Sequence, residues 1–188
     1  ALINQSVKES DYTIVSIFVN PKQFNNPTDS LNYPQQNLND IEICRNNGVD
    51  ALFMPDVSLM YPNDDSLMID LESHYDEPES SNRPGHFSGM LTIVAKLLVL
   101  INPTTAYFGE KDYVQLMMIK KLAEYLFIKC TIIGVPTVRD KYGLALSSRN
   151  NRLSKEGEKK ARLINLILRE STSIDDTRNA LIKAGLEV

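Results

Sequence analysis

Two segments of the chain place amide and charged side chains where a strand is expected to end. Asn20 and Gln23 follow an apolar stretch, and each offers an amide donor and an amide acceptor. A second apolar stretch ends in Tyr-Phe-Gly-Glu-Lys-Asp at residues 107–112, and Gln115 comes three residues later. In open α/β sheets, ligands bind at the carboxyl ends of strands. Both segments are therefore candidates for a ligand site, although the residue types of the first favour a simple strand-terminating turn.

The second segment has the composition of an anion site. Gly109 permits a tight turn before a helix, and backbone N–H groups at a helix N-terminus favour an anion. Lys111 adds a mobile positive charge, and the Asp112 carboxylate could hold Mg²⁺ or a hydroxyl group. Gln115 would lie near the same end of the helix. Alternatively, Glu110 and Asp112 are acids that suit the dipole of a solvated helix start.

A third segment, residues 143–150, combines paired hydroxyl groups with a cation. Ser147 and Ser148 precede Arg149, whose planar guanidinium can bind phosphate oxygens through two parallel hydrogen bonds. This pattern favours a triphosphate site, and a polar loop before a helical segment is the alternative. Residues 81–87 form a fourth polar segment, in which a structural role is favoured for His86 because it lacks a paired acid.

The elements that must position these segments alternate between strand and helix. Apolar patterning predicts strands over residues 13–19, 49–54, 104–108 and 129–135, and helices over residues 34–47, 89–102 and 111–127. This alternation predicts an α/β fold with parallel strands and right-handed crossovers. The first strand lacks polar alternation and is expected to be buried on both faces.

The chain changes character near residue 150. Ser154 is a plausible N-cap for one helix, and a second helix is expected over residues 175–184. We therefore predict one domain over residues 1–150 and the start of a smaller C-terminal domain over residues 151–188. Residues 186–188 resemble the beginning of a further strand, so the protein is expected to continue beyond them.

The amino-acid composition excludes several classes of protein for this chain. The chain has 188 residues, with 20 Lys and Arg against 24 Asp and Glu, a net charge of −4, two cysteines and two histidines. Two distant cysteines exclude a disulfide scaffold, and the few histidines and cysteines make a zinc site improbable. The mild acidity argues against a nucleic-acid partner, and no apolar stretch is long enough to span a membrane. A soluble, cytoplasmic protein without a secretory leader is expected.

Four motifs in one order give the chain a specific resemblance. They are Ser-Ile-Phe-Val-Asn-Pro-Lys-Gln-Phe at residues 16–24, Arg-Pro-Gly-His-Phe at 83–87, Tyr-Phe-Gly-Glu-Lys-Asp at 107–112 and Leu-Ser-Ser-Arg-Asn at 146–150. Together they resemble the pantoate–β-alanine ligase family over roughly the whole chain. The resemblance implies a Rossmann-like parallel sheet with helices on both faces, of the nucleotidylyltransferase type. It also implies a smaller C-terminal helical or α+β domain that closes over the site.

The resemblance implies an AMP-forming ligation as the reaction. Pantoate would react with ATP to give pantoyl adenylate and pyrophosphate, and β-alanine would then displace AMP to give pantothenate. The implied reactants are pantoate, β-alanine, ATP and Mg²⁺, and the implied protein is a cytoplasmic homodimer.

The family's site residues carry over onto matching positions. Gln23 and Gln115 would bind pantoate, Gln23 would also lie near β-alanine, and Asn20 would support the pocket. The residues implied to contact ATP are Gly109, Glu110, Lys111, Asp112, Val138, Leu146, Ser147, Ser148 and Arg149. Among these, Lys111, Ser147 and Arg149 would be catalytic, and Asp112 would contact Mg²⁺.

One family motif has no counterpart in the sequence. The resemblance implies His-x-Gly-His upstream of Leu2, and neither His74 nor His86 matches it. The expected explanation is an incomplete chain or a truncated product, whose sheet would lack its central strand. Two other functions therefore stay open, namely a nucleotidylyltransferase acting on a different acceptor and a catalytically silent nucleotide-binding module.

Overall fold

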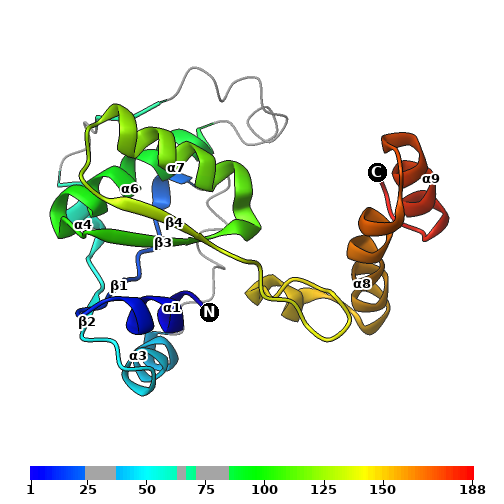
Figure 1. The fold of residues 1–188 in the computed structure, drawn as a ribbon, viewed down its shortest axis with the longest axis horizontal. Coiled ribbons are helices and arrows are strands. Elements are labelled where there is room, and N and C mark those ends of the chain that lie inside the picture. Colours follow the sequence, from blue (N-terminus) through cyan, green and yellow to red (C-terminus); the bar gives the residue numbers. More distant parts are fainter. Residues whose placement is uncertain (24–36, 63–66, 71–84) are drawn as a thin grey trace. The chain divides into compact units, whose positions relative to one another are not determined.

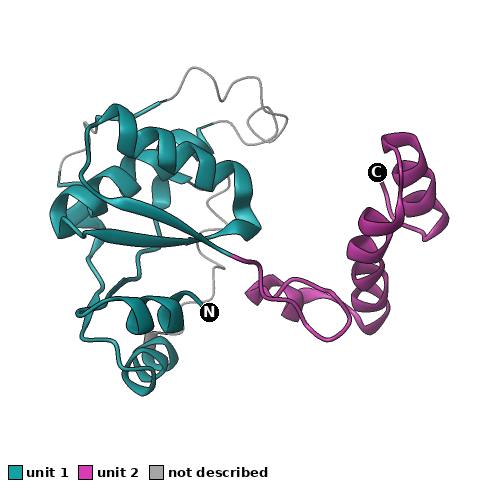
Figure 2. Ribbon diagram, viewed as in Figure 1, with its two compact units in different colours: residues 1–135 teal, residues 136–188 magenta. Residues whose placement is uncertain are grey.

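The computed structural model describes residues 1–23, 37–62, 67–70 and 85–188. The chain divides into two compact units, Ala1–Val135 and Pro136–Val188 (Figure 2). The domain boundary predicted near residue 150 lies inside the second unit. Arg83, which belongs to the fourth polar segment, and His74 lie outside the described residues.

The described part of the first unit contains two short parallel ladders (Figure 1). Strand β1 (Ile14–Ser16) pairs with β2 (Ala51–Phe53), and β3 (Thr105–Gly109) pairs with β4 (Thr131–Val135). Within each ladder a helix follows the first strand along the chain, as parallel pairing requires. The predicted parallel α/β fold is confirmed.

Strand β1 departs from its prediction. It is shorter than the expected residues 13–19, and Ile14 is 40% exposed rather than buried. The prediction of burial on both faces is therefore wrong for this strand. The physical reason is that helices cover the faces of a parallel strand, and among the described elements β1 packs closely with β2 alone.

The three helices predicted in the first unit are present, with shifted ends. Their bounds are α1 (Leu2–Glu9), η1 (Pro21–Gln23), α3 (Asn37–Asn46), α4 (Val57–Met60), α6 (His86–Ile101), η3 (Glu110–Asp112) and α7 (Tyr113–Tyr125). Helix α6 begins three residues before the predicted residue 89, because Gly85 takes the N-cap position with φ of 75°. The helix predicted from residue 111 divides into the 3₁₀ turn η3 and α7. Helix α1, the 3₁₀ turn η1 and the short helix α4 were not predicted.

Helix α6 forms the centre of the hydrophobic core. Its side chains pack with α7, and partly buried residues of β3 and β4 surround them. Leu91 on α6 and Ile119 on α7 are fully buried, and burying such a side chain contributes about 1.5–3 kcal/mol. Helices α6 and α7 lie on one side of β3 and β4, and α1 lies on the other (Figure 1). Helix α6 also contacts the turn η1, so the core helix touches a predicted site segment.

The second unit is mainly helical. It contains an antiparallel bridge between Arg139 and Ala145, followed by η4 (Ser148–Arg152), α8 (Lys155–Glu170) and α9 (Ile174–Lys183). Ser154 caps α8 as predicted, because its hydroxyl accepts a hydrogen bond of 3.0 Å from the Gly157 N–H. Residues 186–188 have no regular structure. No helix in the described ranges of either unit combines the length and the apolar character needed to cross a membrane.

Candidate functional site

The first group of predicted site residues lies on the turn after β1. Asn20 is 1% exposed, and its amide nitrogen donates a 2.9 Å hydrogen bond to the backbone carbonyl of Gly89 on α6. Its amide oxygen accepts from the Lys22 N–H at 3.2 Å and from the Tyr61 hydroxyl at 2.9 Å. Such a buried amide is fully used by protein partners. Asn20 therefore joins the turn to the core helix.

Gln23 ends this turn and is half-buried. Its backbone carbonyl lies 2.8 Å from Nδ1 of His86, the first residue of α6. A carbonyl only accepts hydrogen bonds, so this contact requires a proton on Nδ1 of His86. The side-chain oxygen of Gln23 also accepts a longer bond of 3.4 Å from Asn20. The structure therefore brings Asn20 and Gln23 together, as predicted, and gives His86 the structural contact that was favoured for it.

Tyr61 belongs to this group but was missed from the sequence. The Nζ atom of Lys96 lies 4.4 Å from its ring centroid, and Lys96 also donates to the carbonyl of Met60. Burial raises the pKa of Tyr61 above its ordinary value. Tyr61 is therefore a neutral phenol at neutral pH and can donate to Asn20. Tyr61 lies 41 residues after Asn20 in an irregular stretch, so no local signal linked the two.

The second group lies where β3 ends. Gly109 is the last residue of β3, and η3 follows directly with Glu110, Lys111 and Asp112. The side chains of Lys111 and Asp112 are 43% and 67% exposed, and Nζ lies 4.0 Å from Oδ1. An exposed pair at this distance stabilises little, so the ammonium group is accessible to an anion in solvent. Gln115, on the first turn of α7, is half-buried.

Glycine at position 134 makes room beside this segment. A Cβ atom there would approach a side-chain oxygen of Glu110 to 3.1 Å and a methyl group of Leu116 to 2.8 Å. The Glu110 side chain therefore lies against the backbone of β4, next to the end of its neighbouring strand β3. This packing orients Glu110 without any charged partner being needed.

Among the described residues, Asp112 could contribute a single carboxylate to a metal ion. Within them, no three His, Cys, Asp or Glu side chains are grouped to hold a metal. A single exposed carboxylate does not make a site built from protein ligands alone. It does fit Mg²⁺, which keeps several waters and is commonly held by one or two carboxylates together with phosphate oxygens.

The third group lies in the second unit and forms a preorganised loop. The Leu146 N–H donates a 2.9 Å hydrogen bond to the Val138 carbonyl, so these two predicted ATP-binding residues are neighbours. Ser147 caps η4, because its hydroxyl accepts from the Arg149 N–H at 3.2 Å. Both Ser148 and Arg149 are exposed. The predicted hydroxyl and guanidinium groups thus lie on one structured turn.

A charged contact fastens this loop to α8. One carboxylate oxygen of Asp140 accepts from the Tyr142 and Leu144 N–H groups at 2.8 and 2.9 Å, and the other accepts from Arg162 Nε at 3.3 Å. Desolvation raises the pKa of Asp140, but these hydrogen bonds and the Arg162 charge together bring it below its ordinary value. Arg162 also contacts Glu158 at 2.6 Å. The sequence did not single out Asp140 or Arg162.

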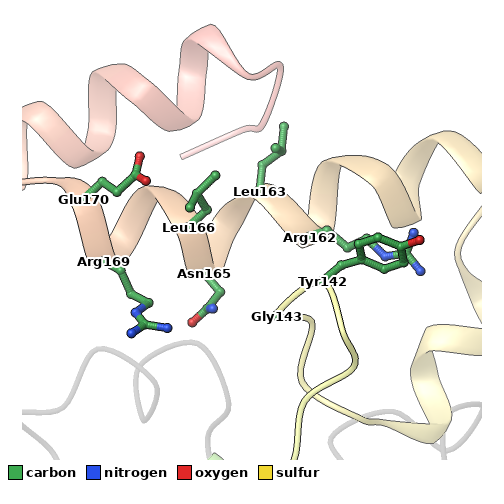
Figure 3. A pocket seen from close by; sticks show the side chains of 8 residues that line it. All are labelled: Tyr142, Gly143, Arg162, Leu163, Asn165, Leu166, Arg169 and Glu170. Atoms are coloured by element: carbon green, nitrogen blue, oxygen red, sulfur yellow. The ribbon is translucent and has the colours of Figure 1, made fainter.

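An open groove lies beside this contact, between α8 and the turn at Tyr142 (Figure 3). The Tyr142 ring lies over the guanidinium of Arg162 with 4.0 Å between ring centroid and Cζ. The groove encloses about 650 Å³ and is lined by Tyr142, Gly143, Arg162, Leu163, Asn165, Leu166, Arg169 and Glu170. These lining residues include none of the predicted site residues.

The parallel ladders, the flanking helices and the polar groups after β1 and β3 define the class of protein. The fold is Rossmann-like, of the nucleotidylyltransferase type. The family model for pantoate-beta-alanine ligase matches residues 1–187. The chain belongs to this family.

Individual relatives agree with the family model. The pantothenate synthetase of Coxiella burnetii (strain Dugway 5J108-111) is 43% identical over 188 residues, which are 100% of this chain and 73% of that protein. The pantothenate synthetase of Bdellovibrio bacteriovorus is 41% identical over 187 residues, covering 100% of this chain and 74% of that protein. The chain thus spans about three quarters of these relatives.

Solved structures give the same result. A pantoate-beta-alanine ligase from Francisella tularensis, complexed with beta-gamma ATP and beta-alanine, has a TM-score of 0.90 at 44% identity, covering 98% of this chain and 72% of that one. Pantothenate synthetase from Thermus thermophilus has a TM-score of 0.88 at 37% identity, covering 97% of this chain and 69% of that one. The predicted family and ligase class are confirmed, and the two alternative functions are not favoured.

Proposed function

We propose that this chain condenses pantoate with β-alanine through a pantoyl adenylate. A pantoate carboxylate oxygen attacks the α-phosphorus of ATP, and the bond from that phosphorus to pyrophosphate breaks. The β-alanine amine then attacks the acyl carbon, the bond to AMP breaks, and the amine loses a proton as pantothenate forms. The family match over residues 1–187 carries this proposal.

Amide side chains are proposed to bind pantoate. Gln23 and Gln115 can donate to a carboxylate and accept from hydroxyl groups, which are the groups that pantoate presents. Both side chains belong to residues that are half-buried. Asn20 supports the pocket from the interior, because its amide is bonded to Gly89, Tyr61 and the turn itself.

Cationic side chains are proposed to bind the triphosphate. The reacting carboxylate and ATP are both anions, so Lys111 and Arg149 lower their repulsion and stabilise charge in the transition state. Holding the two reactants in line supplies a further part of the rate. The remaining ATP contacts are assigned to Gly109, Glu110 and Asp112 on one segment and to Val138, Leu146, Ser147 and Ser148 on the other.

Three further features belong to the proposal. Asp112 would contact Mg²⁺, and Mg²⁺ bound with the phosphates would neutralise part of their charge. The protein would act as a cytoplasmic homodimer, as the family resemblance implies. Cys44 and Cys130 are both free thiols, as is usual for proteins of a reducing compartment.

Pyrophosphate–ATP exchange tests the proposal. With pantoate as the only acid and no β-alanine present, the intact protein should exchange labelled pyrophosphate into ATP. A hydroxy acid that lacks the pantoate side chain serves as the control and should give no exchange. Absence of exchange with pantoate, or AMP transfer to a phosphate-bearing acceptor instead, would refute the proposed reaction.

A further inference from the structure

The turn that carries Gln23 lies unusually close to helix α6. A Cβ atom built on Gly89 would stand 2.4 Å from the Lys22 carbonyl oxygen and 3.0 Å from the Gln23 nitrogen. Both of these atoms belong to the backbone and cannot move away by rotation of a side chain. Only glycine at position 89 therefore allows this approach.

Two hydrogen bonds hold the same approach on either side of Gly89. The Asn20 amide donates to the Gly89 carbonyl at 2.9 Å, and the His86 ring donates to the Gln23 carbonyl at 2.8 Å. His86 and Gly89 are three residues apart and thus share one face of α6. That face is anchored in the core, since Met90 and Leu91 beside it are 2% and 0% exposed.

We propose that Gly89 and His86 are positioning residues for the amide of Gln23, an inference that rests on the pantoate-binding role proposed above for Gln23. Neither residue touches the reacting atoms. They fix the backbone of the turn, and the backbone fixes the origin of the Gln23 side chain. A displacement on the order of 1 Å can lower a rate about a hundredfold, so this contact is functional as well as structural.

The first variant, Gly89→Ala, is expected to lower the stability of the protein, which is the opposite of the usual effect of this substitution in a helix. In a helix interior alanine is normally more stable than glycine. Here the added Cβ must displace the turn by roughly 1 Å to reach ordinary van der Waals contact. We expect a lower melting temperature and a KM for pantoate raised about tenfold, with the KM for ATP within about twofold of its original value.

A matched control separates positioning from general loss of stability. Ile93 is 5% exposed on the same helix. Ile93→Val removes one buried methyl group and should lower the melting temperature without changing the KM for pantoate. If Ile93→Val raises that KM as much as Gly89→Ala does, the effect is one of stability and the inference is wrong.

The second variant tests the hydrogen bond. His86→Ala removes the donor to Gln23 and should raise the KM for pantoate. His86→Asn keeps an N–H donor near the position of Nδ1 and should recover most of the loss. Equal KM values for the two variants would overturn the role assigned to His86.

The variant Gln23→Ala distinguishes failure of the inference from failure of the pantoate assignment. If Gln23→Ala raises the KM for pantoate and Gly89→Ala does not, the inference is wrong and the proposed function stands. If Gln23→Ala has no effect, the role of Gln23 fails and the inference fails with it.

The double variant tests whether the two residues act through one contact. In the Gln23→Ala background, Gly89→Ala should change the KM for pantoate by less than about twofold, because both variants remove the same contact. A full additional tenfold change would contradict the proposal.

Discussion

The turn that carries Gln23 and the loop that carries Arg149 are held by different kinds of contact. Neutral groups fasten the turn to α6, chiefly through Asn20, which is 1% exposed, and through close backbone packing at Gly89. Charged groups fasten the loop region to α8, through Asp140 and Arg162, whose side chains are 23% and 27% exposed.

This difference determines how each region should respond to its surroundings. Hydrogen bonds between buried neutral groups are shielded from salt. Coulombic contacts between partly exposed groups weaken as ionic strength rises. The substrate-binding turn is therefore expected to be insensitive to ionic strength, whereas the ATP-binding loop is expected to respond to it.

The largest effect is expected at the loop's own cation. Arg149→Lys keeps the charge but loses the planar guanidinium with its paired donors. Pantoate-dependent pyrophosphate exchange should fall at least about tenfold. Arg152→Lys, on the same 3₁₀ helix, is the control and should stay near the original rate. An unchanged exchange rate in Arg149→Lys would contradict the proposed contact between the Arg149 guanidinium and the triphosphate.

A smaller effect is expected from loss of the buried amide. Asn20→Ala leaves the Gly89 carbonyl and the Tyr61 hydroxyl without their partner, which should lower the free energy of unfolding by about 1–3 kcal/mol. Chemical denaturation measures this change. Asn47→Ala is the control, because the Asn47 amide makes an exposed 2.8 Å bond to the Ile43 carbonyl. Equal losses in the two variants would show that burial at Asn20 contributes nothing.

A still smaller effect is expected at Asp140. Asp140→Asn removes the charge that Arg162 contacts but keeps an oxygen for the Tyr142 and Leu144 N–H groups. At low ionic strength the exchange rate should fall by about twofold, and the difference should disappear at about 1 M salt. The same salt series should leave the effect of Asn20→Ala unchanged. If the loss of exchange rate in Asp140→Asn does not depend on salt, the proposed difference between the turn and the loop is wrong.

The smallest effects are expected in the pH dependence of unfolding. The lowered pKa of Asp140 contributes stability above the ordinary carboxyl value of about 4, and this is lost as pH falls through the lowered value. The raised pKa of Tyr61 contributes stability below about pH 10, and this is lost as pH rises through the raised value. Melting curves should therefore show a shallower acid limb in Asp140→Asn and a shallower alkaline limb in Tyr61→Phe. If the acid and alkaline limbs are the same in the variants as in the original protein, the pKa values of these two groups do not change on folding.

The sequence predicted those features that depend on neighbouring residues. The Ser154 cap, the end of the helix predicted over residues 34–47 and the polar turn after β1 are each encoded within a few positions. Burial of β1 was predicted wrongly, because the burial of a strand depends on which elements pack over its faces.

Contacts between distant residues could not be predicted from local pattern. Asn20 meets Gly89 across 69 positions, and Arg162 meets Asp140 across 22. Gly89 carried no signal of its own, since its importance lies in a backbone approach that only the folded chain creates. The roles proposed for Lys111 and Arg149 came from the residue types of their segments together with the family resemblance, and they stay predictions.

The central proposal is that the Lys111 ammonium and the Arg149 guanidinium act on the same nucleotide. A double-variant cycle in pantoate-dependent pyrophosphate exchange tests it most directly, with Lys111→Ala, Arg149→Ala and both together. Groups that act on the same phosphates are not additive, so the double variant should be at most about tenfold slower than the slower single variant. Rate losses that multiply in full would show that the two cations act independently and would contradict the account.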